Sequence, residues 1–355
     1  MKTLCIVFGG VSSEHQVSLR SAASVLENVD RQLFGVHMLG ITREGRWLYY
    51  DGSTELIPTG EWETSPRATP AIISPDRSHG GILLLGEGGP RIIQVDVVFG
   101  VLHGKNGEDG TIQGLLELAG IPYVGCGVLA SALCMDKALA HTVLTGAGIK
   151  KTELAVVHPH EMQDFAALEK RLLSELGYPM FVKPANAGSS VGVSRAATVK
   201  DLSAALALAL SHDKKAVVEQ EVRGRELECS VIGGSDPEVA RAAGEIMPAS
   251  GQFYSYEAKY QNDSAKLCIP ADLPEDVAQN MRETAARAYK VMGCEGFARV
   301  DFFLTEQGEL ILNEINTIPG FTSISMFPKL FAASGLPYDR LITRLVEYAL
   351  KRSSS

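Results

Sequence analysis

The sequence predicts an α/β protein that begins with an open, doubly wound parallel sheet and continues into mixed α+β units. Two short apolar runs support this fold class: residues 4–8, which end at a double glycine, and residues 95–102, which end at His103 and Gly104. Near-continuous apolar runs of this length are typical of strands buried on both faces of a parallel sheet. Ligands of such sheets bind at the carboxyl ends of the strands, which places Glu14 and His103 beside a predicted site.

The remaining elements follow in order along the chain. The side chain of Ser12 or Ser13 is expected to cap the first helix. The rest of the first unit is expected to contain strands within 36–50 joined by a turn at 43–46, a loop with short strands over 51–91, and a helix at 111–119. A second unit, from about Ser131, is expected to contain helices at 135–147, 161–176 and 200–211, and strands at 180–183 and 216–222. A third unit, from about Gly224, is expected to contain strands at 226–233, 296–304 and 309–315 and a helix at 338–351.

The composition is that of a folded globular protein. The chain has 355 residues, enough for two or three domains at roughly 150 residues each. Hydrophobic residues make up 45% and charged residues 21% of the chain, which argues against disorder. Lys plus Arg number 33 against 42 Asp plus Glu, so the net charge is −9. Because nucleic-acid binders usually present a basic patch, we expect no nucleic-acid partner.

The termini and the cysteines indicate a cytoplasmic protein. The apolar stretch 4–8 is too short for a signal peptide, and no run approaches the roughly 18 apolar residues of a transmembrane helix, so we expect no membrane association. The six cysteines form no closely spaced pair, which predicts reduced, buried thiols rather than a zinc or redox site. They are Cys5, Cys126, Cys134, Cys229, Cys268 and Cys294.

The clearest functional signal is a predicted hairpin over residues 297–316. Two apolar runs flank a polar turn that contains Gly308. If the turn centres on residues 307–308, Asp301 faces Glu314, and Arg299 faces Asn316. Because side chains alternate across a strand, these four residues project from one face of the hairpin.

Facing carboxylates repel each other unless a cation lies between them. Asp301, Glu314 and the amide oxygen of Asn316 form an all-oxygen set of the kind that Mg²⁺ prefers, with phosphates and water completing its shell. The alternative is a solvated hairpin face on which Arg299 neutralises Asp301. The apolar runs on both sides favour a buried hairpin and therefore the metal site.

A second signal is the stretch 181–193, in which Lys183 closes a strand and a loop of small residues opens the next. Small residues let backbone N–H groups approach phosphate oxygens, and the lysine supplies a cation. The stretch is not a Walker A loop, because the lysine precedes the glycines, and the spacing of Gly188 and Gly192 is not a dinucleotide fingerprint. A plain tight turn is the alternative interpretation.

Three weaker motifs point the same way. A polar bend at Gly224 offers groups for an adenine and a ribose, the aromatic stretch 253–260 suits a lid, and the Pro-Gly turn in 316–325 exposes backbone N–H groups. Taken singly, the bend is more often a charged loop and the aromatic stretch simple packing. Together with the hairpin and the lysine loop, they predict a site for a nucleoside triphosphate with Mg²⁺.

The same motifs resemble, in order and over essentially the whole chain, those of the D-alanine–D-alanine ligases of the ATP-grasp superfamily. The matching stretches are FGGVSSEHQVSL from Phe8, LHGKNGEDGTIQG from Leu102, MDK from Met135, VKPANAGSSVGV from Val182, EQEVRGRELE from Glu219, YEAKY from Tyr256, ARVDFFL from Ala298 and NEINTIPGFTSIS from Asn313. The resemblance implies an ATP-grasp fold with three domains. These are a substrate-binding α/β domain at 1–125, a central domain at 126–222 and a C-terminal domain with the metal site at 223–355, the last two gripping ATP between antiparallel sheets.

The resemblance also implies an activity. Two D-alanines and ATP would give D-alanyl-D-alanine, ADP and phosphate through an acyl phosphate, for peptidoglycan precursor synthesis in a homodimer. Related D-alanine–D-lactate ligases lack the lid tyrosine. Because Tyr260 is present, D-alanine is expected as the second substrate.

Carried onto this chain, the resemblance implies a role for each matching residue. The phosphates of ATP would be bound by Lys137, Lys183 and Lys259. The adenine and ribose would be contacted by Glu219, Gln220, Val222, Glu226 and Phe253. A pair of Mg²⁺ ions, replaceable by Mn²⁺, would be held by Asp301, Glu314 and Asn316.

The remaining roles concern the amino acids. Glu14 would bind the ammonium of the first D-alanine and form a hydrogen-bonded set with Ser189 and Tyr260 that closes the lid. Arg299 and the Gly320 N–H would stabilise an oxyanion. The second carboxylate would be held by Ser325 and Met326, and His103 would lie close to the substrates.

Three rival interpretations are weaker. Another ATP-grasp ligase with a different amino acid would lack the motif around Glu14. A non-catalytic nucleotide-binding module would have lost a metal ligand or Arg299. A dehydrogenase built on the first unit would need the Gly-x-Gly-x-x-Gly spacing, which Gly9 and Gly10 do not provide.

Overall fold

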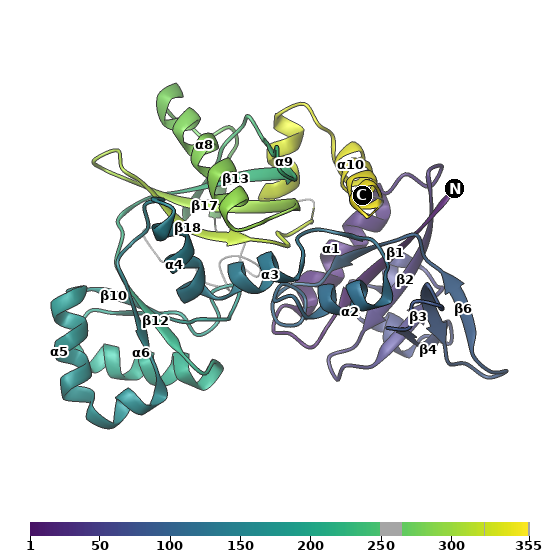
Figure 1. The fold of residues 1–355 in the computed structure, drawn as a ribbon, viewed down its shortest axis with the longest axis horizontal. Coiled ribbons are helices and arrows are strands. Elements are labelled where there is room, and N and C mark those ends of the chain that lie inside the picture. The colour runs from purple at the N-terminus through teal and green to yellow at the C-terminus, as the bar shows by residue number, and fades with distance from the viewer. Residues whose placement is uncertain (249–264, 323, 354–355) are drawn as a thin grey trace.

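The computed structural model describes residues 1–248, 265–322 and 324–353. Three β-sheets, each covered by helices, follow one another along the chain (Figure 1). The mixed α/β class predicted from the sequence is confirmed.

The first sheet has eight strands in the order β6-β5-β4-β3-β2-β1-β7-β8. Its parallel part consists of β1 (Lys2–Gly9), β2 (Phe34–Ile41), β7 (Val97–Val101) and β8 (Tyr123–Val124). The apolar runs predicted as buried strands are β1 and β7. The loop region 51–91 contributes strands, as expected, and these extend the sheet in antiparallel fashion. The antiparallel part consists of β3 (Trp47–Tyr50), β4 (Ala68–Ile73), β5 (Gly81–Leu84) and β6 (Arg91–Gln94).

Helices α1 (His15–Asn28) and α2 (Thr111–Ala119) follow β1 and β7. The bounds of α2 are those predicted, but the predicted serine cap of α1 is wrong. The N-cap residue is Glu14, and its side chain makes no capping hydrogen bond. Ser12 lies two residues before this position, and its Oγ accepts a hydrogen bond from the Glu14 N–H at 3.1 Å. The carboxylate of Glu14 is therefore available at the carboxyl end of β1.

Two short helices, α3 (Val128–Met135) and α4 (Lys137–Gly146), lead to the second sheet. The sequence predicted one helix over 135–147, whereas the chain breaks at Asp136. The backbone of Asp136 is extended, and its carboxylate caps α4 by accepting hydrogen bonds from Ala138 and Leu139, both at 3.1 Å. In the parts of the chain that the structure covers, no single helix is long and apolar enough to cross a membrane; α3 and α4 reach that composition only as a pair bent by 102°.

The second sheet has four strands in the order β11-β10-β12-β9, all antiparallel. Its strands are β9 (Leu154–Val157), β10 (Met180–Pro184), β11 (Ser194–Ala196) and β12 (Ala216–Gln220). Helices α5 (Phe165–Glu175) and α6 (Val199–His212) bury their apolar sides against it. Of these strands, only β9 was not predicted.

The third sheet is built on a long antiparallel hairpin. Its strands are β13 (Gly224–Gly233), β14 (Glu238–Val239), β15 (Gly244–Pro248), β16 (Ala265–Cys268), β17 (Gly296–Thr305) and β18 (Leu310–Asn316). β18 is an edge strand beside β17. Helices α8 (Glu275–Val291), α9 (Met326–Ala333) and α10 (Tyr338–Arg352) complete the chain.

The C-terminal segment returns to the first sheet. Helix α10 lies beside α1 (Figure 1), and one hydrophobic core contains residues of both units. Within it, the ring of Phe321 packs edge-on against Phe99 of β7 and Phe297 of β17, with centroids 5.5 and 5.4 Å apart. These contacts hold the hairpin β17–β18 beside the carboxyl ends of β1 and β7.

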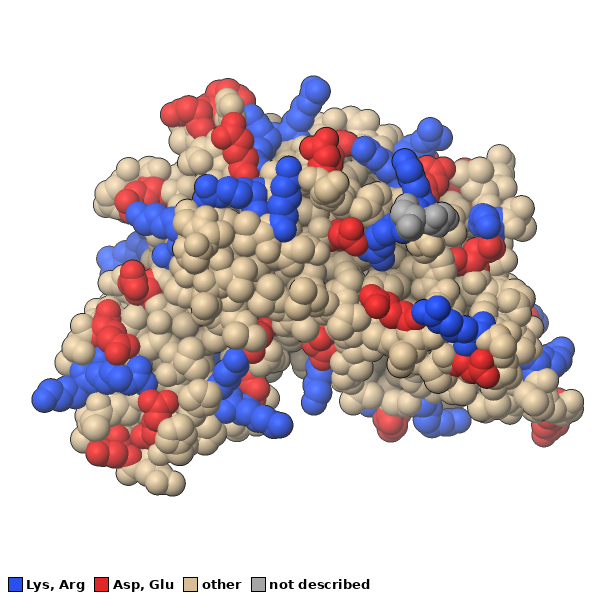
Figure 2. Space-filling view, viewed as in Figure 1, with Lys and Arg blue, Asp and Glu red and all other residues tan. Residues whose placement is uncertain are grey.

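Basic and acidic side chains are interspersed on the face shown in Figure 2. The surface is hollowed at its lower edge, between the second sheet and the first. The functional residues predicted from the sequence come from the elements around this junction of the three units.

Candidate active site

A cleft of about 740 Å³ lies where the first and third sheets meet the loop after β10. Most of the residues predicted to act on substrates line it, as do two of the three predicted metal ligands. They are Glu14, His103, Ser189, Arg299, Glu314, Asn316, Gly320, Ser325 and Met326.

The carboxylate of Glu14 is buried, with the residue 5% exposed. It accepts a hydrogen bond from the hydroxyl of Ser189. Ser189 has a φ of 47°, a backbone conformation that non-glycine residues adopt rarely and often at functional sites. A Cβ at Gly104 or Gly188 would clash with this carboxylate, so both loops approach it as closely as their backbones allow. The predicted Glu14–Ser189 pair is present; its third member, Tyr260, lies outside the described residues.

His103 is buried at the end of β7, with both ring nitrogens engaged. Nδ1 lies 3.0 Å from the carbonyl oxygen of Ile318, and Nε2 lies 3.1 Å from the hydroxyl of Ser21. A carbonyl only accepts, so Nδ1 carries the proton and Nε2 accepts from Ser21. Burial lowers the pKa of His103 to about 4. This neutral histidine borders the cleft and ties β7 to α1 and to the loop after β18.

The hairpin β17–β18 has the predicted pairing, with Asp301 opposite Glu314 and Arg299 opposite Asn316. The guanidinium of Arg299 donates two hydrogen bonds of 2.7 Å to the two oxygens of Asp301. The amide nitrogen of Asn316 donates to the same carboxylate at 2.9 Å. The side chain of Glu228 approaches Arg299 from β13, with Nε and Oε2 3.1 Å apart.

The charges of Arg299, Asp301 and Glu228 stabilise one another. Burial would lower the pKa of Arg299, but the carboxylates of Asp301 and Glu228 raise it well above its usual range. The guanidinium is therefore a permanent cation at the wall of the cleft. Asp301 itself lies behind Arg299 and is only 8% exposed.

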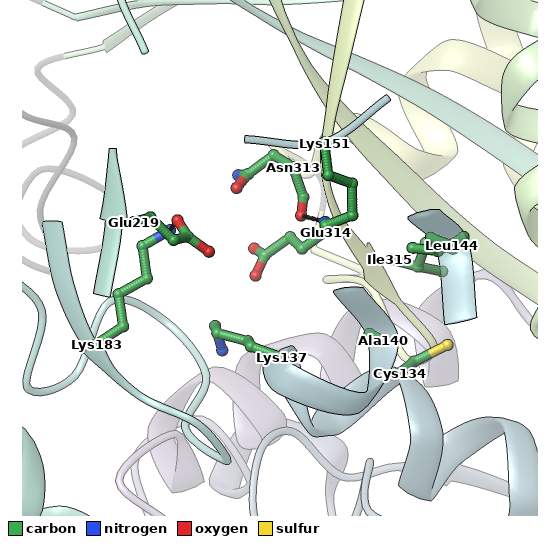
Figure 3. A pocket seen from close by; sticks show the side chains of 10 residues that line it. All are labelled: Cys134, Lys137, Ala140, Leu144, Lys151, Lys183, Glu219, Asn313, Glu314 and Ile315. Carbon is green, nitrogen blue, oxygen red and sulfur yellow. Dashed lines mark hydrogen bonds and ion pairs between the residues drawn. The ribbon is translucent and has the colours of Figure 1, made fainter. Parts of the chain in front are cut away.

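A smaller pocket lies between the second and third sheets and contains several of the residues predicted to bind ATP. Lys137, Lys183, Glu219 and Glu314 point into it, from α4, β10, β12 and β18 respectively (Figure 3). Glu314 lines both this pocket and the cleft, so the two cavities meet at the hairpin.

A buried ion pair joins Lys183 to Glu219 across β10 and β12. Burial opposes both charges, yet the pKa of Lys183 is raised by Glu219, and the pKa of Glu219 is lowered by Lys183. Lys137 donates to the carbonyl oxygen of Ala187 at 2.6 Å. It thereby holds the loop of small residues that the sequence predicted to approach phosphates.

The other residues predicted to contact the nucleotide either do not line the small pocket or lie outside the described residues. Gln220 ends β12, Val222 follows it, and Glu226 lies on β13; none of them lines the small pocket. Phe253 and Lys259 lie outside the described residues.

The side-chain oxygens at the hairpin fit Mg²⁺ only when a bound nucleotide adds phosphate oxygens. Within residues 1–248, 265–322 and 324–353, no cluster of three His, Cys, Asp or Glu side chains is arranged to hold a metal ion. Asp301 and Glu314 supply two carboxylates, and a turn of the Asn316 amide would present Oδ1 in place of Nδ2. Mg²⁺ is often bound in this way, by one or two carboxylates plus phosphate oxygens and water. The residues therefore fit a metal that arrives with a nucleotide.

Sequence reasoning missed three charged residues of the site. Glu108 lines the cleft, and burial together with the charge of Glu14 raises its pKa well above the usual range. It lies in the motif that begins at Leu102, but the sequence motif did not indicate a role for it. Glu228 reaches Arg299 only through the pairing of β13 with β17, which no local pattern reveals. Lys151 lines the small pocket and belongs to no motif.

Comparisons with known proteins match the chain to one family of ligases along almost its whole length. A family model described as "D-ala D-ala ligase N-terminus" matches residues 3–126, and one described as "D-ala D-ala ligase C-terminus" matches residues 143–347. The chain is 47% identical to a D-alanine–D-alanine ligase of Acetivibrio thermocellus, covering 99% of this chain and 96% of that protein. It is 46% identical to the same enzyme of Caldicellulosiruptor bescii, covering 99% and 95%.

Two solved structures share the fold. The VanG D-Ala:D-Ser ligase of Enterococcus faecalis superposes with a TM-score of 0.88 at 41% identity, over 98% of this chain and 99% of that chain. The D-alanine–D-alanine ligase of Coxiella burnetii superposes with a TM-score of 0.86 at 33% identity, over 100% and 96%.

The two antiparallel sheets around a lysine-lined pocket, with the adjoining carboxylate hairpin, define an ATP-grasp ligase. The family resemblance drawn from the sequence is confirmed. The chain belongs to the D-alanine–D-alanine ligase family.

Proposed function

We propose that the protein joins two molecules of D-alanine to D-alanyl-D-alanine, with conversion of ATP to ADP and phosphate, for peptidoglycan precursor synthesis. One observation carries this proposal: the cleft that holds the buried Glu14 carboxylate is also lined by Arg299 and Glu314. A carboxylate suits the ammonium of an amino acid, and the hairpin suits a nucleotide with its metal. An amino acid and the γ-phosphate would therefore meet in one enclosed space.

The nucleotide is assigned to the small pocket. Lys137 and Lys183 would bind its phosphates, and the segment from Glu219 to Glu226 would contact the adenine and ribose. The close approach of the Gly188–Ser189 loop to Glu14 supports this arrangement, because the same loop would face the phosphates and the amino acid. Phe253 and Lys259 are proposed to complete the pocket, on the family resemblance alone.

Asp301, Glu314 and Asn316 would hold Mg²⁺, as a pair of ions, or Mn²⁺ in its place. When bound, such ions neutralise the charge that develops during phosphoryl transfer. The protein's own part is to hold the oxygen ligands on one face of the hairpin.

The amino-acid chemistry is assigned to the cleft. Glu14, fixed by Ser189, would orient the first D-alanine so that its carboxylate accepts the γ-phosphoryl group and becomes an acyl phosphate. The amine of the second D-alanine would then attack this carbonyl carbon. Arg299 and the Gly320 N–H would stabilise the negative oxygen of the tetrahedral intermediate, and Ser325 with Met326 would hold the second carboxylate.

D-alanine is proposed as the second substrate as well as the first. The solved relatives include a D-Ala:D-Ser ligase, so family membership alone does not decide the nucleophile. Tyr260, which D-alanine–D-lactate ligases lack, argues against D-lactate. A direct competition between D-alanine and D-serine decides the nucleophile.

The test is ADP release from Mg-ATP with D-alanine, with L-alanine in a parallel reaction, and mass spectrometry of the product. We expect D-specific ADP release and an alanine dipeptide. Equimolar D-alanine with D-serine or D-lactate, at neutral pH, should give D-alanyl-D-alanine as the main product. A main product containing serine or lactate would overturn the second-substrate assignment, and nucleotide binding without D-alanine-dependent turnover would overturn the function.

We further propose a cytoplasmic homodimer with units at 1–125, 126–222 and 223–355. Each unit contains one of the three sheets, and all six cysteines are free thiols, which fits a reducing compartment. Light scattering of the purified protein would give the mass of a dimer, and a monomer mass would contradict this assembly.

A further inference from the structure

The facing of Asp301 and Glu314 depends on a β-bulge in β18. Next to the turn, Leu304 pairs with Leu310 and Phe302 with Leu312, but the following pair is Asp301 with Glu314. Asn313 is thus an extra residue without a partner on β17. Continued from the turn without this extra residue, the ladder would pair Asp301 with Asn313 instead.

The bulge also decides which face Glu314 occupies. Leu310, Leu312 and Ile315 all face the same hydrophobic core, although a regular strand would place residues 312 and 315 on opposite faces. The extra residue shifts the alternation by one position, so that Ile315 is buried and Glu314 turns into the small pocket. A slip of one residue would reverse this and direct Glu314 into the core.

Lys151 holds the two residues that form the bulge. Its ammonium group donates a hydrogen bond to the carbonyl oxygen of Leu312 at 3.2 Å. It donates another to the carbonyl oxygen of Asn313 (Figure 3). The neighbouring Lys150 accepts a backbone hydrogen bond from the Leu312 N–H at 2.9 Å. The segment before β9 therefore covers the outer edge of β18 at this point.

The double contact is specific to the bulged conformation. In a regular strand, the carbonyl oxygens of consecutive residues point to opposite edges, so one ammonium group on one edge reaches only one of them. A bulge removes a residue from the ladder and leaves its carbonyl in need of another donor. Lys151 supplies that donor from the wall of the pocket into which Glu314 points.

We propose that Lys151 is a positioning residue for the metal ligands: by binding the carbonyl oxygens of Leu312 and Asn313, it stabilises the bulge that brings Glu314 and Asn316 to the face of Asp301. This inference rests on the metal site under the proposed function. Lys151 touches neither substrate nor metal in this role. It acts through the backbone of β18.

The first test concerns the bulge alone and needs no ligand. Lys151→Met keeps the length and apolar stem of the side chain and removes its donors. Hydrogen–deuterium exchange of the metal-free protein should be faster over residues 310–316 in this variant. Lys150→Met is the matched control, because that side chain reaches Glu309 beside the turn at 2.6 Å and not the bulge. Unchanged exchange in Lys151→Met, or equal acceleration in both variants, would overturn the proposal.

The second test measures metal affinity apart from activity. Mn²⁺ is titrated by electron paramagnetic resonance into the complex with the β,γ-imido analogue of ATP. Lys151→Met should weaken Mn²⁺ binding by about tenfold or more, the usual effect of losing an outer-shell partner, and Lys151→Arg should restore most of it. Binding of the analogue in EDTA should change little. Loss of nucleotide affinity in EDTA with unchanged Mn²⁺ affinity would make Lys151 a nucleotide ligand instead.

The two tests separate this inference from the proposed function. If the wild-type complex bound no Mn²⁺, the metal site itself would be wrong, and with it the positioning role. If the wild type binds Mn²⁺ and Lys151→Met binds it equally well, only the role of Lys151 falls.

Discussion

Ser189 donates a hydrogen bond to the carboxylate of Glu14, although 175 positions separate the two residues in the sequence. The pair joins the loop after β10 to the start of α1, and so links the second sheet to the first. Because Gly188 and Gly104 enclose the same carboxylate, the proposed amino-acid site is completed only when these loops come together. Under the proposed function, Glu14 would thereby connect the position of the phosphate-binding loop with the position of the first amino acid.

Glu14→Gln should weaken binding of the first D-alanine much more than binding of ATP. The variant removes the charge that would pair with the ammonium, and hydrogen bonds to charged groups contribute about 1.5–3 kcal/mol. We expect a loss of at least about tenfold in D-alanine affinity, since each 1.4 kcal/mol is roughly a factor of ten. Calorimetry with each ligand separately checks this ordering. A larger loss of ATP affinity would remove Glu14 from the amino-acid site.

Asp301→Asn should reduce turnover at limiting Mg²⁺ by at least about tenfold, roughly 1.4 kcal/mol of barrier. The amide is a weaker metal ligand, and Arg299 would lose its bidentate partner. Added Mg²⁺ should recover part of the rate, because weaker binding can be offset by concentration.

Glu245→Gln is a matched control for that variant. Glu245 lies on β15 of the same sheet and pairs with Arg225 at 2.8 and 2.7 Å, but it does not line the cleft. It should leave the Mg²⁺ dependence unchanged. If both variants shifted the Mg²⁺ dependence equally, the effect of Asp301 would be structural and the metal assignment would fail.

Replacing one member of the Lys183–Glu219 ion pair should destabilise the protein more than replacing both members. Replacing one partner leaves the other buried and unpaired, which destabilises a protein by about 3–5 kcal/mol. Lys183→Met and Glu219→Gln should each lower the melting temperature of the nucleotide-free protein, and the double variant should recover part of the loss. Additive losses in the double variant would contradict a coupled pair.

The sequence was sufficient to predict the mixed α/β class and several of the residues that line the cleft, but not Glu108 or Glu228. The buried runs that became β1 and β7 are short, almost entirely apolar and followed by glycines, so the local pattern indicates their structure. The pairing of Asp301 with Glu314 was also predicted, but by a register that does not hold throughout the hairpin. Near the turn the observed pairs are shifted by one residue, and the bulge at Asn313 restores the predicted pairing where the site requires it.

The sequence could not predict contacts between side chains that lie on distant elements. The break at Asp136 and the start of α1 after Glu14 depend on local hydrogen bonds between side chains and the backbone. Helix propensities do not predict which of several such hydrogen bonds forms. The contacts of Glu228 with Arg299 and of Lys151 with the bulge depend on which strands and segments lie side by side. No spacing within the sequence encodes either contact.

His103 should make the protein sensitive to acid. Burial lowers its pKa to about 4 in the folded protein, whereas an unfolded chain has a value near 6.5. Between these values the unfolded chain binds more protons, so this contribution to stability is complete above pH 6.5 and is lost as the pH falls toward 4. A difference of about 2.5 units corresponds to roughly 3 kcal/mol.

His103→Gln isolates this contribution from those of other groups. Its amide can still donate to the Ile318 carbonyl and accept from Ser21, yet it does not titrate. Urea unfolding at pH 7 and pH 5 should show a smaller loss of stability in the variant than in the wild type, because titrating groups elsewhere affect both proteins alike. Equal losses would mean that His103 is protonated without strain in the folded protein, and that its contacts with Ile318 and Ser21 do not hold it neutral.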